Sequence, residues 1–81
     1  MTYAEAIRRI EEIAETMPII TSENFFKNQV HRDQEEAIGN IYAIADEFNA
    51  QEDRDNYIDI LWDDEDRAIF VNDIKITLKE I

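Results

Sequence analysis

The sequence predicts one α+β domain in which two amphipathic helices pack on a three-stranded antiparallel sheet, in the chain order ααβββ. Three observations lead to this prediction. Apolar residues in the first half of the chain recur with the 3.6-residue period of a helix. After Asn56 the period changes to two, and turn-forming residues divide the remainder into three short segments. Eighty-one residues suffice for a single domain, residues 1–81, and leave little for a second.

The first helix is expected over about residues 2–17. Thr2 and Glu5 have the spacing of a capping box, in which each residue satisfies a backbone N–H of the first turn. Pro18 disfavours helical angles at the residue before it and so ends the helix. The apolar stripe of this helix has members at alternating steps of four and three: Tyr3, Ile7, Ile10, Ala14 and Met17.

The connection, residues 18–32, is expected to be irregular with a short helical turn in it. Ser22 is a suitable N-cap for such a turn. We expect the turn to carry Phe25 and Phe26 towards the core.

The second helix is expected over about residues 33–51. Asp33 is the expected N-cap, because Asp33 and Glu36 repeat the capping pattern in front of a second apolar stripe. Gly39 lowers helix stability by up to about 1 kcal/mol relative to alanine, so we expect it to mark a close helix crossing. The members of the stripe are Ala37, Ile38, Ile41, Ile44, Ala45 and Phe48.

Three strands are expected at about residues 57–62, 67–71 and 74–78. Residues 63–66 and the pair Asn72-Asp73 supply the turns between them. Because both turns are short, consecutive strands should pair antiparallel and form a meander.

The two turns predict a register. The shorter turn pairs Val71 with Ile74, and the longer one pairs Trp62 with Arg67. The pairs that follow from these are Ile69 with Ile76, Ile60 with Ile69, and Ile58 with Val71. Both registers place the same apolar side chains on one face, which the helices should cover: Ile58, Ile60, Trp62, Ile69, Val71, Ile74, Ile76 and Leu78.

The opposite face of the sheet carries a smaller apolar patch. Tyr57, Leu61 and Phe70 lie on it, ringed by charged residues such as Asp59. Aromatic anchors within a polar rim are a common binding pattern, so these three residues are interaction candidates. The alternative is that residues 19–30 fold over them.

The charge is unevenly distributed along the chain. The formal net charge is −12, and residues 31–66 hold thirteen acidic residues against two basic ones. This charge would be repelled by phosphate backbones and by anionic lipid, so we expect no direct nucleic-acid or membrane binding. The sequence also shows no signal peptide and no run of the roughly 20 apolar residues that a membrane helix needs.

Catalytic and metal-binding patterns are weak. The chain has one histidine, one serine and no cysteine, so we expect no enzymatic activity, no catalytic residue and no cofactor. The lack of cysteine fits a reducing, cytoplasmic setting. Residues 53–64 begin like a calcium loop, but Ile58 stands in the glycine position and Asp64 in the glutamate position. We therefore predict no metal site and retain a cation-binding regulatory domain only as a second alternative.

The functional prediction is a small, non-enzymatic, acidic module that binds a basic protein partner. Its most specific form is an inhibitor or nucleic-acid mimic that occupies the basic groove of a nucleic-acid-binding protein. The first alternative is a structural subunit that forms a homodimer through the outer sheet face or the open edge strand. The predicted contact residues are the carboxylates of one acidic belt and the apolar patch: Glu35, Glu36, Asp46, Glu47, Glu52, Asp53, Asp55, Asp63, Asp64, Glu65, Asp66, Tyr57, Leu61 and Phe70.

Overall fold

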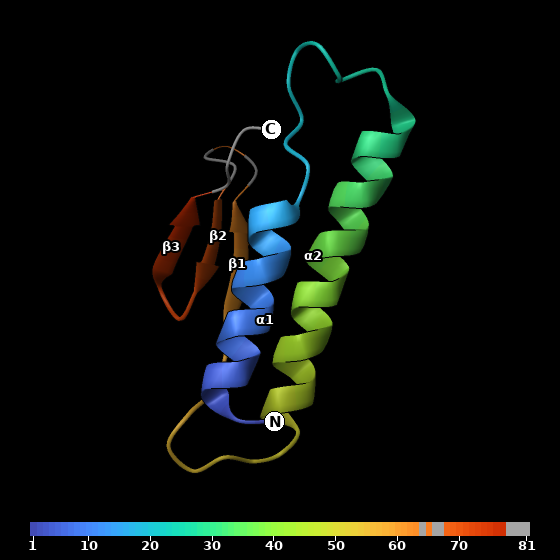
Figure 1. Ribbon diagram of the computed structural model, residues 1–81. Helices are drawn as coiled ribbons and strands as arrows, with labels where there is room; N and C mark the ends of the chain where they lie inside the picture. The colour runs from blue at the N-terminus through green and yellow to red at the C-terminus, as the bar shows by residue number, and fades with distance from the viewer. Residues whose placement is uncertain (64, 66–67, 78–81) are drawn as a thin grey trace.

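A computed structural model describes residues 1–63, 65 and 68–77. It contains α1 (Tyr3–Thr16), α2 (Asn28–Asn49), β1 (Ile60–Asp63), β2 (Ala68–Val71) and β3 (Ile74–Thr77). The helices lie side by side, and an antiparallel sheet of strand order β1-β2-β3 packs against them, which confirms the predicted ααβββ fold (Figure 1). The molecule is elongated, with extents of 45 × 20 × 16 Å. Four positions used in the predictions fall outside the described residues: Asp64, Asp66, Arg67 and Leu78.

Helix α1 begins and ends where the sequence predicts, within one residue. The Thr2 hydroxyl accepts a hydrogen bond of 3.1 Å from the Glu5 backbone N–H and so caps the first turn. At the other end Met17 is extended (φ −67°, ψ 131°), as expected for a residue that precedes proline.

Helix α2 begins at Asn28, five residues before the predicted start, so the prediction of Asp33 as N-cap is wrong. Gln34 lies on the buried side of α2, and its Nε2 donates to the Pro18 carbonyl oxygen at 3.3 Å. Asp33 lies on the exposed side, where it accepts a hydrogen bond of 2.7 Å from Gln29. Gln34 is polar and stands in the buried stripe, so it interrupts the apolar periodicity. The periodicity therefore placed the start of α2 too late.

Gly39 lies on the solvent side of α2. No heavy atom stands within 4 Å of the position that a Cβ would occupy. The predicted close crossing at Gly39 is therefore wrong, and packing does not require glycine there.

The β2–β3 hairpin has the predicted register. Val71 lies opposite Ile74, and Ile69 lies opposite Ile76. The turn Asn72-Asp73 has φ of 51° and 67°, the two positive values that a type I′ hairpin turn requires.

The β1–β2 hairpin is shifted by two residues from the predicted register. Trp62 lies opposite Ile69 instead of Arg67, because β1 continues through Asp63 before the chain turns. The other two predicted pairs, Ile60 with Ile69 and Ile58 with Val71, are wrong for the same reason, since Ile60 lies opposite Val71. An even shift leaves every side chain on its predicted face, so the assignment of faces is unaffected.

The shift also explains why β1 starts at Ile60 instead of Tyr57. In the observed register the residues before Asp59 lie beyond the end of β2, where the chain has already turned towards β3. Ile58 is held by α2 instead. The Asn49 side chain donates to the Ile58 carbonyl oxygen at 2.8 Å and accepts from the Ile58 N–H at 2.9 Å. One side chain thus fixes the start of the sheet to the end of α2.

The core lies between the two helices and continues over the inner face of β1 and β2. Tyr3 packs edge-on against Phe48 with ring centroids 5.7 Å apart, and Trp62 packs partly buried against the core, as predicted. Ile74 lies on the same face but is 69% exposed, so the prediction that the helices cover it is wrong. β3 is the strand farthest from the helices (Figure 1). The buried apolar residues of this core are Ala6, Ile10, Ala14, Met17, Ile19, Ile41, Ala45, Phe48, Ile58, Ile60, Ile69 and Val71.

The connection between the helices projects beyond the end of α1 (Figure 1). Thr21, and not the predicted Ser22, closes its turn: the Thr21 N–H donates to Asn24 Oδ1 at 2.6 Å, and the Asn24 N–H donates to Thr21 Oγ1 at 3.3 Å. Phe25 is 55% and Phe26 88% exposed, so the prediction that they point into the core is wrong. Because α2 is longer than α1, this turn sits past the end of the buried interface.

Candidate functional site

Four of the predicted contact carboxylates lie on the solvent side of α2: Glu35, Glu36, Asp46 and Glu47. The opposite side of the helix is buried against α1, which directs these side chains outward. The two acidic pairs are eleven residues apart, which is about three helical turns and about 16 Å along the axis. Both pairs therefore point in the same direction from one rigid helix.

Three more predicted carboxylates, Glu52, Asp53 and Asp55, lie in the loop after α2. Asp53 Oδ1 accepts hydrogen bonds from the N–H groups of Asp55 at 2.9 Å and of Asn56 at 3.1 Å, which fixes the loop in a tight turn. All three acidic side chains are exposed. Together with the last acidic pair of α2 they form the acidic end of the molecule, which consists of Asp46, Glu47, Glu52, Asp53 and Asp55.

The third acidic segment, the turn after β1, lies elsewhere. Asp63 is half-exposed and accepts a hydrogen bond of 2.9 Å from the Glu65 N–H, and Glu65 is exposed. Asp64 and Asp66 fall outside the described residues. β1 runs away from the acidic end, so this turn is at the opposite end of the strand (Figure 1). The structure therefore divides the predicted belt into separate acidic surfaces.

The acidic surface of α2 and its following loop is largely uncompensated. Within the described part of the chain, six of its carboxylate side chains take part in no hydrogen bond or ion pair: Glu35, Glu36, Asp46, Glu47, Glu52 and Asp55. The cations next to this surface are Arg32, three residues before Glu35 on α2, Arg54 in the loop, and the Met1 ammonium, which donates to Gln51 Oε1 at 2.7 Å. Exposed charges of one sign create a field that attracts cationic partners.

The outer face of the sheet carries the predicted apolar patch. Tyr57 is 68% and Leu61 61% exposed, and Phe70, the cross-strand neighbour of Leu61, is half-buried. Lys75 follows on β3 beside Phe70. The alternative that the connection between the helices covers Tyr57 and Leu61 is therefore wrong.

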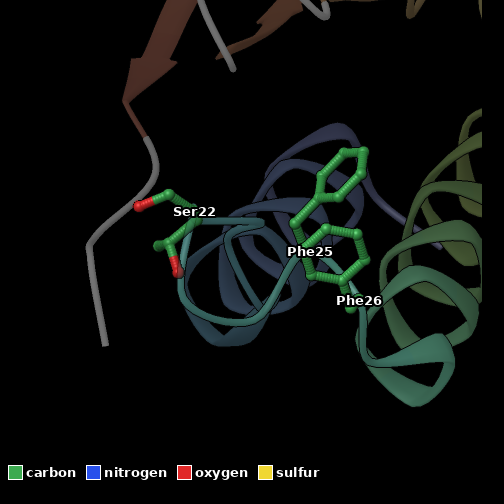
Figure 2. A pocket seen from close by; sticks show the side chains of 4 residues that line it. Ser22, Phe25 and Phe26 are labelled. Atoms are coloured by element: carbon green, nitrogen blue, oxygen red, sulfur yellow. The ribbon is translucent and has the colours of Figure 1, made fainter.

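Sequence reasoning missed the exposed Phe25–Phe26 pair, which we name the Phe knob (Figure 2). Its two rings meet edge to face, with centroids 5.4 Å apart, beside a hollow of about 360 Å³. The ring of His31 packs edge-on against Phe25, and His31 Nε2 donates to the Phe25 carbonyl oxygen at 2.7 Å. Residues 18–32 carry no apolar periodicity, so the sequence held no signal that would have indicated the exposure of these two rings.

A second missed feature is a groove between α1 and β3. Its volume is about 200 Å³, and we name it the side groove. The hydroxyl of Tyr3, on one wall, accepts a hydrogen bond of 2.9 Å from Asn72 Nδ2, so that wall is held in place. The lining residues are Tyr3, Ile7, Glu11, Val71, Ile74 and Ile76. The groove exists because α1 leaves the inner face of β3 partly uncovered.

Among the described residues, no three histidine or acidic side chains are grouped so that they could hold a metal ion. Neither described helix has an apolar stretch long enough to cross a membrane.

No protein-family model matches this chain, and comparison with curated proteins and with solved structures found no significant match.

Proposed function

We propose that this protein is a small, non-enzymatic module that binds a basic partner protein through the acidic end and the solvent side of α2. The observation that supports this function best is the set of exposed carboxylates on one helix and its following loop that have no partner among the described residues. A cationic partner would gain attraction from each of them without first displacing an internal ion pair. With no cysteine in the chain, we place this module in a reducing, cytoplasmic setting.

In its most specific form, the module is an inhibitor that occupies the basic groove of a nucleic-acid-binding protein. Such grooves are lined by lysine and arginine side chains that neutralise a rigid row of phosphates. A straight helix with two acidic pairs about 16 Å apart presents negative charge at fixed intervals in a comparable way. In its general form, the proposal requires only that the partner has a basic surface complementary to these carboxylates.

The experiment is capture from a cell lysate on the immobilised protein at low and at high salt, followed by identification of the retained proteins. We expect a basic protein to be retained at low salt and released at high salt, because salt screens exposed charges over about 8–10 Å. Elution with double-stranded DNA and with RNA tests the mimic, since a nucleic acid would compete for the same groove. Retention that does not depend on salt would exclude the electrostatic mechanism.

A second candidate function is a structural subunit that self-associates through the outer face of the sheet. The observation that favours it is the exposure of Tyr57 and Leu61 beside Phe70. Sedimentation of the wild type and of Leu61→Lys over a range of concentrations tests it. Self-association that survives a lysine at the centre of the patch would exclude this surface.

A further inference from the structure

The Phe knob is rigidly presented. Thr21 and Asn24 exchange two hydrogen bonds, as described above. In addition, Asn24 Nδ2 donates to the Ile19 carbonyl oxygen at 3.0 Å. The Lys27 N–H donates to the Asn24 carbonyl oxygen at 2.9 Å. The His31 contact fixes the other side of Phe25. A preordered loop loses little conformational freedom on binding, so an exposed ring on it is suited to insertion into a pocket.

The side groove has the size and chemistry to accept one of these rings. An apolar cavity of about 150 Å³ is large enough to hold benzene, and the side groove has about 200 Å³. Five of its six lining residues are apolar or aromatic. Ile74, at the margin of the side groove, is 69% exposed and would become more buried if a ring filled the groove.

The two elements cannot meet within one molecule. The Phe knob lies at the end where α2 begins, whereas the side groove lies beside the starts of α1 and β3, towards the other end of a molecule 45 Å long (Figure 1). A second copy, in contrast, can bring its knob to the groove. The contact would be head-to-tail, because two different surfaces meet and each copy of a pair keeps one of its two elements free for a further copy.

Local charge agrees with this pairing. Residues 21–32 around the Phe knob hold two exposed basic residues, Lys27 and Arg32, against one exposed acidic residue, Glu23. The charged residue that lines the side groove is Glu11. We propose that Phe26 of one copy inserts into the side groove of a second copy, and that the protein thereby assembles head-to-tail through an apolar contact oriented by these charges. This inference does not depend on the proposed function, because it uses neither the acidic end nor the outer face of the sheet.

Salt separates the two mechanisms. Each copy carries a net charge of −12, so whole molecules repel one another and salt should strengthen their assembly. Binding of a basic partner should weaken as salt rises. Failure of one proposal therefore leaves the other testable.

The test is sedimentation velocity over a range of concentrations at about 0.15 M salt, where charges are screened beyond about 8 Å. We compare the wild type with Phe26→Ser, which removes the knob, and Ile74→Lys, which blocks the groove. Both sites are exposed, so both variants should fold, and circular dichroism verifies it. Asn40→Lys is the matched control, since it places the same charge at an exposed residue of α2 that lies outside both elements and outside the outer face of the sheet.

We expect the wild type and Asn40→Lys to form species that grow with concentration. Phe26→Ser and Ile74→Lys should each associate about 30-fold or more weakly, the effect of truncating an interface hot spot. Mixed together, these two variants should form a one-to-one dimer that does not grow, because one supplies the intact groove and the other the intact knob. A monomeric wild type, assembly unaffected by either variant, or a mixture that stays monomeric would overturn the proposal.

Discussion

The two faces of the β1–β2 hairpin carry similar apolar side chains but bury them very differently. On the inner face Ile69 is fully buried and Val71 is 4% exposed. On the outer face Leu61 is 61% exposed. The difference comes from the helices, which pack on one face only. In this molecule alternation decides which face a side chain occupies, and the helix layer buries Ile69 and Val71 while it leaves Leu61 exposed.

The largest expected effect breaks the buried face. Ile69→Ala should lower the free energy of unfolding by about 2–5 kcal/mol, because it removes buried methyl groups and leaves a cavity. Leu61→Ala on the exposed face should change it by only about 0.5 kcal/mol or less. Urea unfolding of both variants measures the contrast, and equal losses would contradict the assignment of the two faces.

The next effect concerns the join between α2 and the sheet. Asn49→Ala removes both hydrogen bonds to the Ile58 backbone and should cost about 1–3 kcal/mol, since two partly buried backbone groups lose their partners. Asn40→Ala, at an exposed position of the same helix, is the control and should be close to neutral. A loss no larger than the control's would show that Asn49 does not hold the sheet.

A stabilising change is expected on the solvent side of α2. Gly39→Ala should raise the free energy of unfolding by about 0.5–1 kcal/mol, because alanine favours the helix and the added Cβ meets no atom within 4 Å. Thermal unfolding measures it as a higher midpoint. A lower midpoint would mean that something packs against this side of the helix after all.

The smallest expected effect on stability is at the Phe knob. Phe26→Ser should change the free energy of unfolding by about 0.5 kcal/mol or less, since the ring is 88% exposed. The measurement is urea unfolding at a protein concentration low enough to keep the chain monomeric. A loss comparable to that of Ile69→Ala would identify Phe26 as a core residue and contradict its exposed position.

Features set by local chemistry could be predicted from the sequence. The Thr2 cap, the end of α1 before Pro18 and the tight turn at Asn72-Asp73 each depend on a few neighbouring residues. The two faces of the sheet also followed, because a register error of two residues preserves them.

Features set by distant parts of the chain could not be predicted in the same way. The burial of Gln34 on α2 goes with its hydrogen bond to Pro18, a contact that no periodicity reveals. The exposure of Phe25 and Phe26 follows from the unequal lengths of the two helices. The division of the acidic belt follows from the direction of β1, which carries the turn after it away from the acidic end. The residues of the candidate contact surface could therefore be predicted from the sequence, but not which of them lie together in the fold.

The measurement that tests the central proposal most directly is the affinity of the captured basic partner for two variants of equal net charge. One variant neutralises the acidic end with Asp46→Asn, Glu47→Gln and Glu52→Gln. The other neutralises three exposed carboxylates outside it, with Glu12→Gln, Glu15→Gln and Glu23→Gln. We expect the first variant to bind at least about tenfold more weakly at low salt, while the second stays close to the wild type. Equal affinities for the two variants would show that binding does not use the acidic end and would contradict the account.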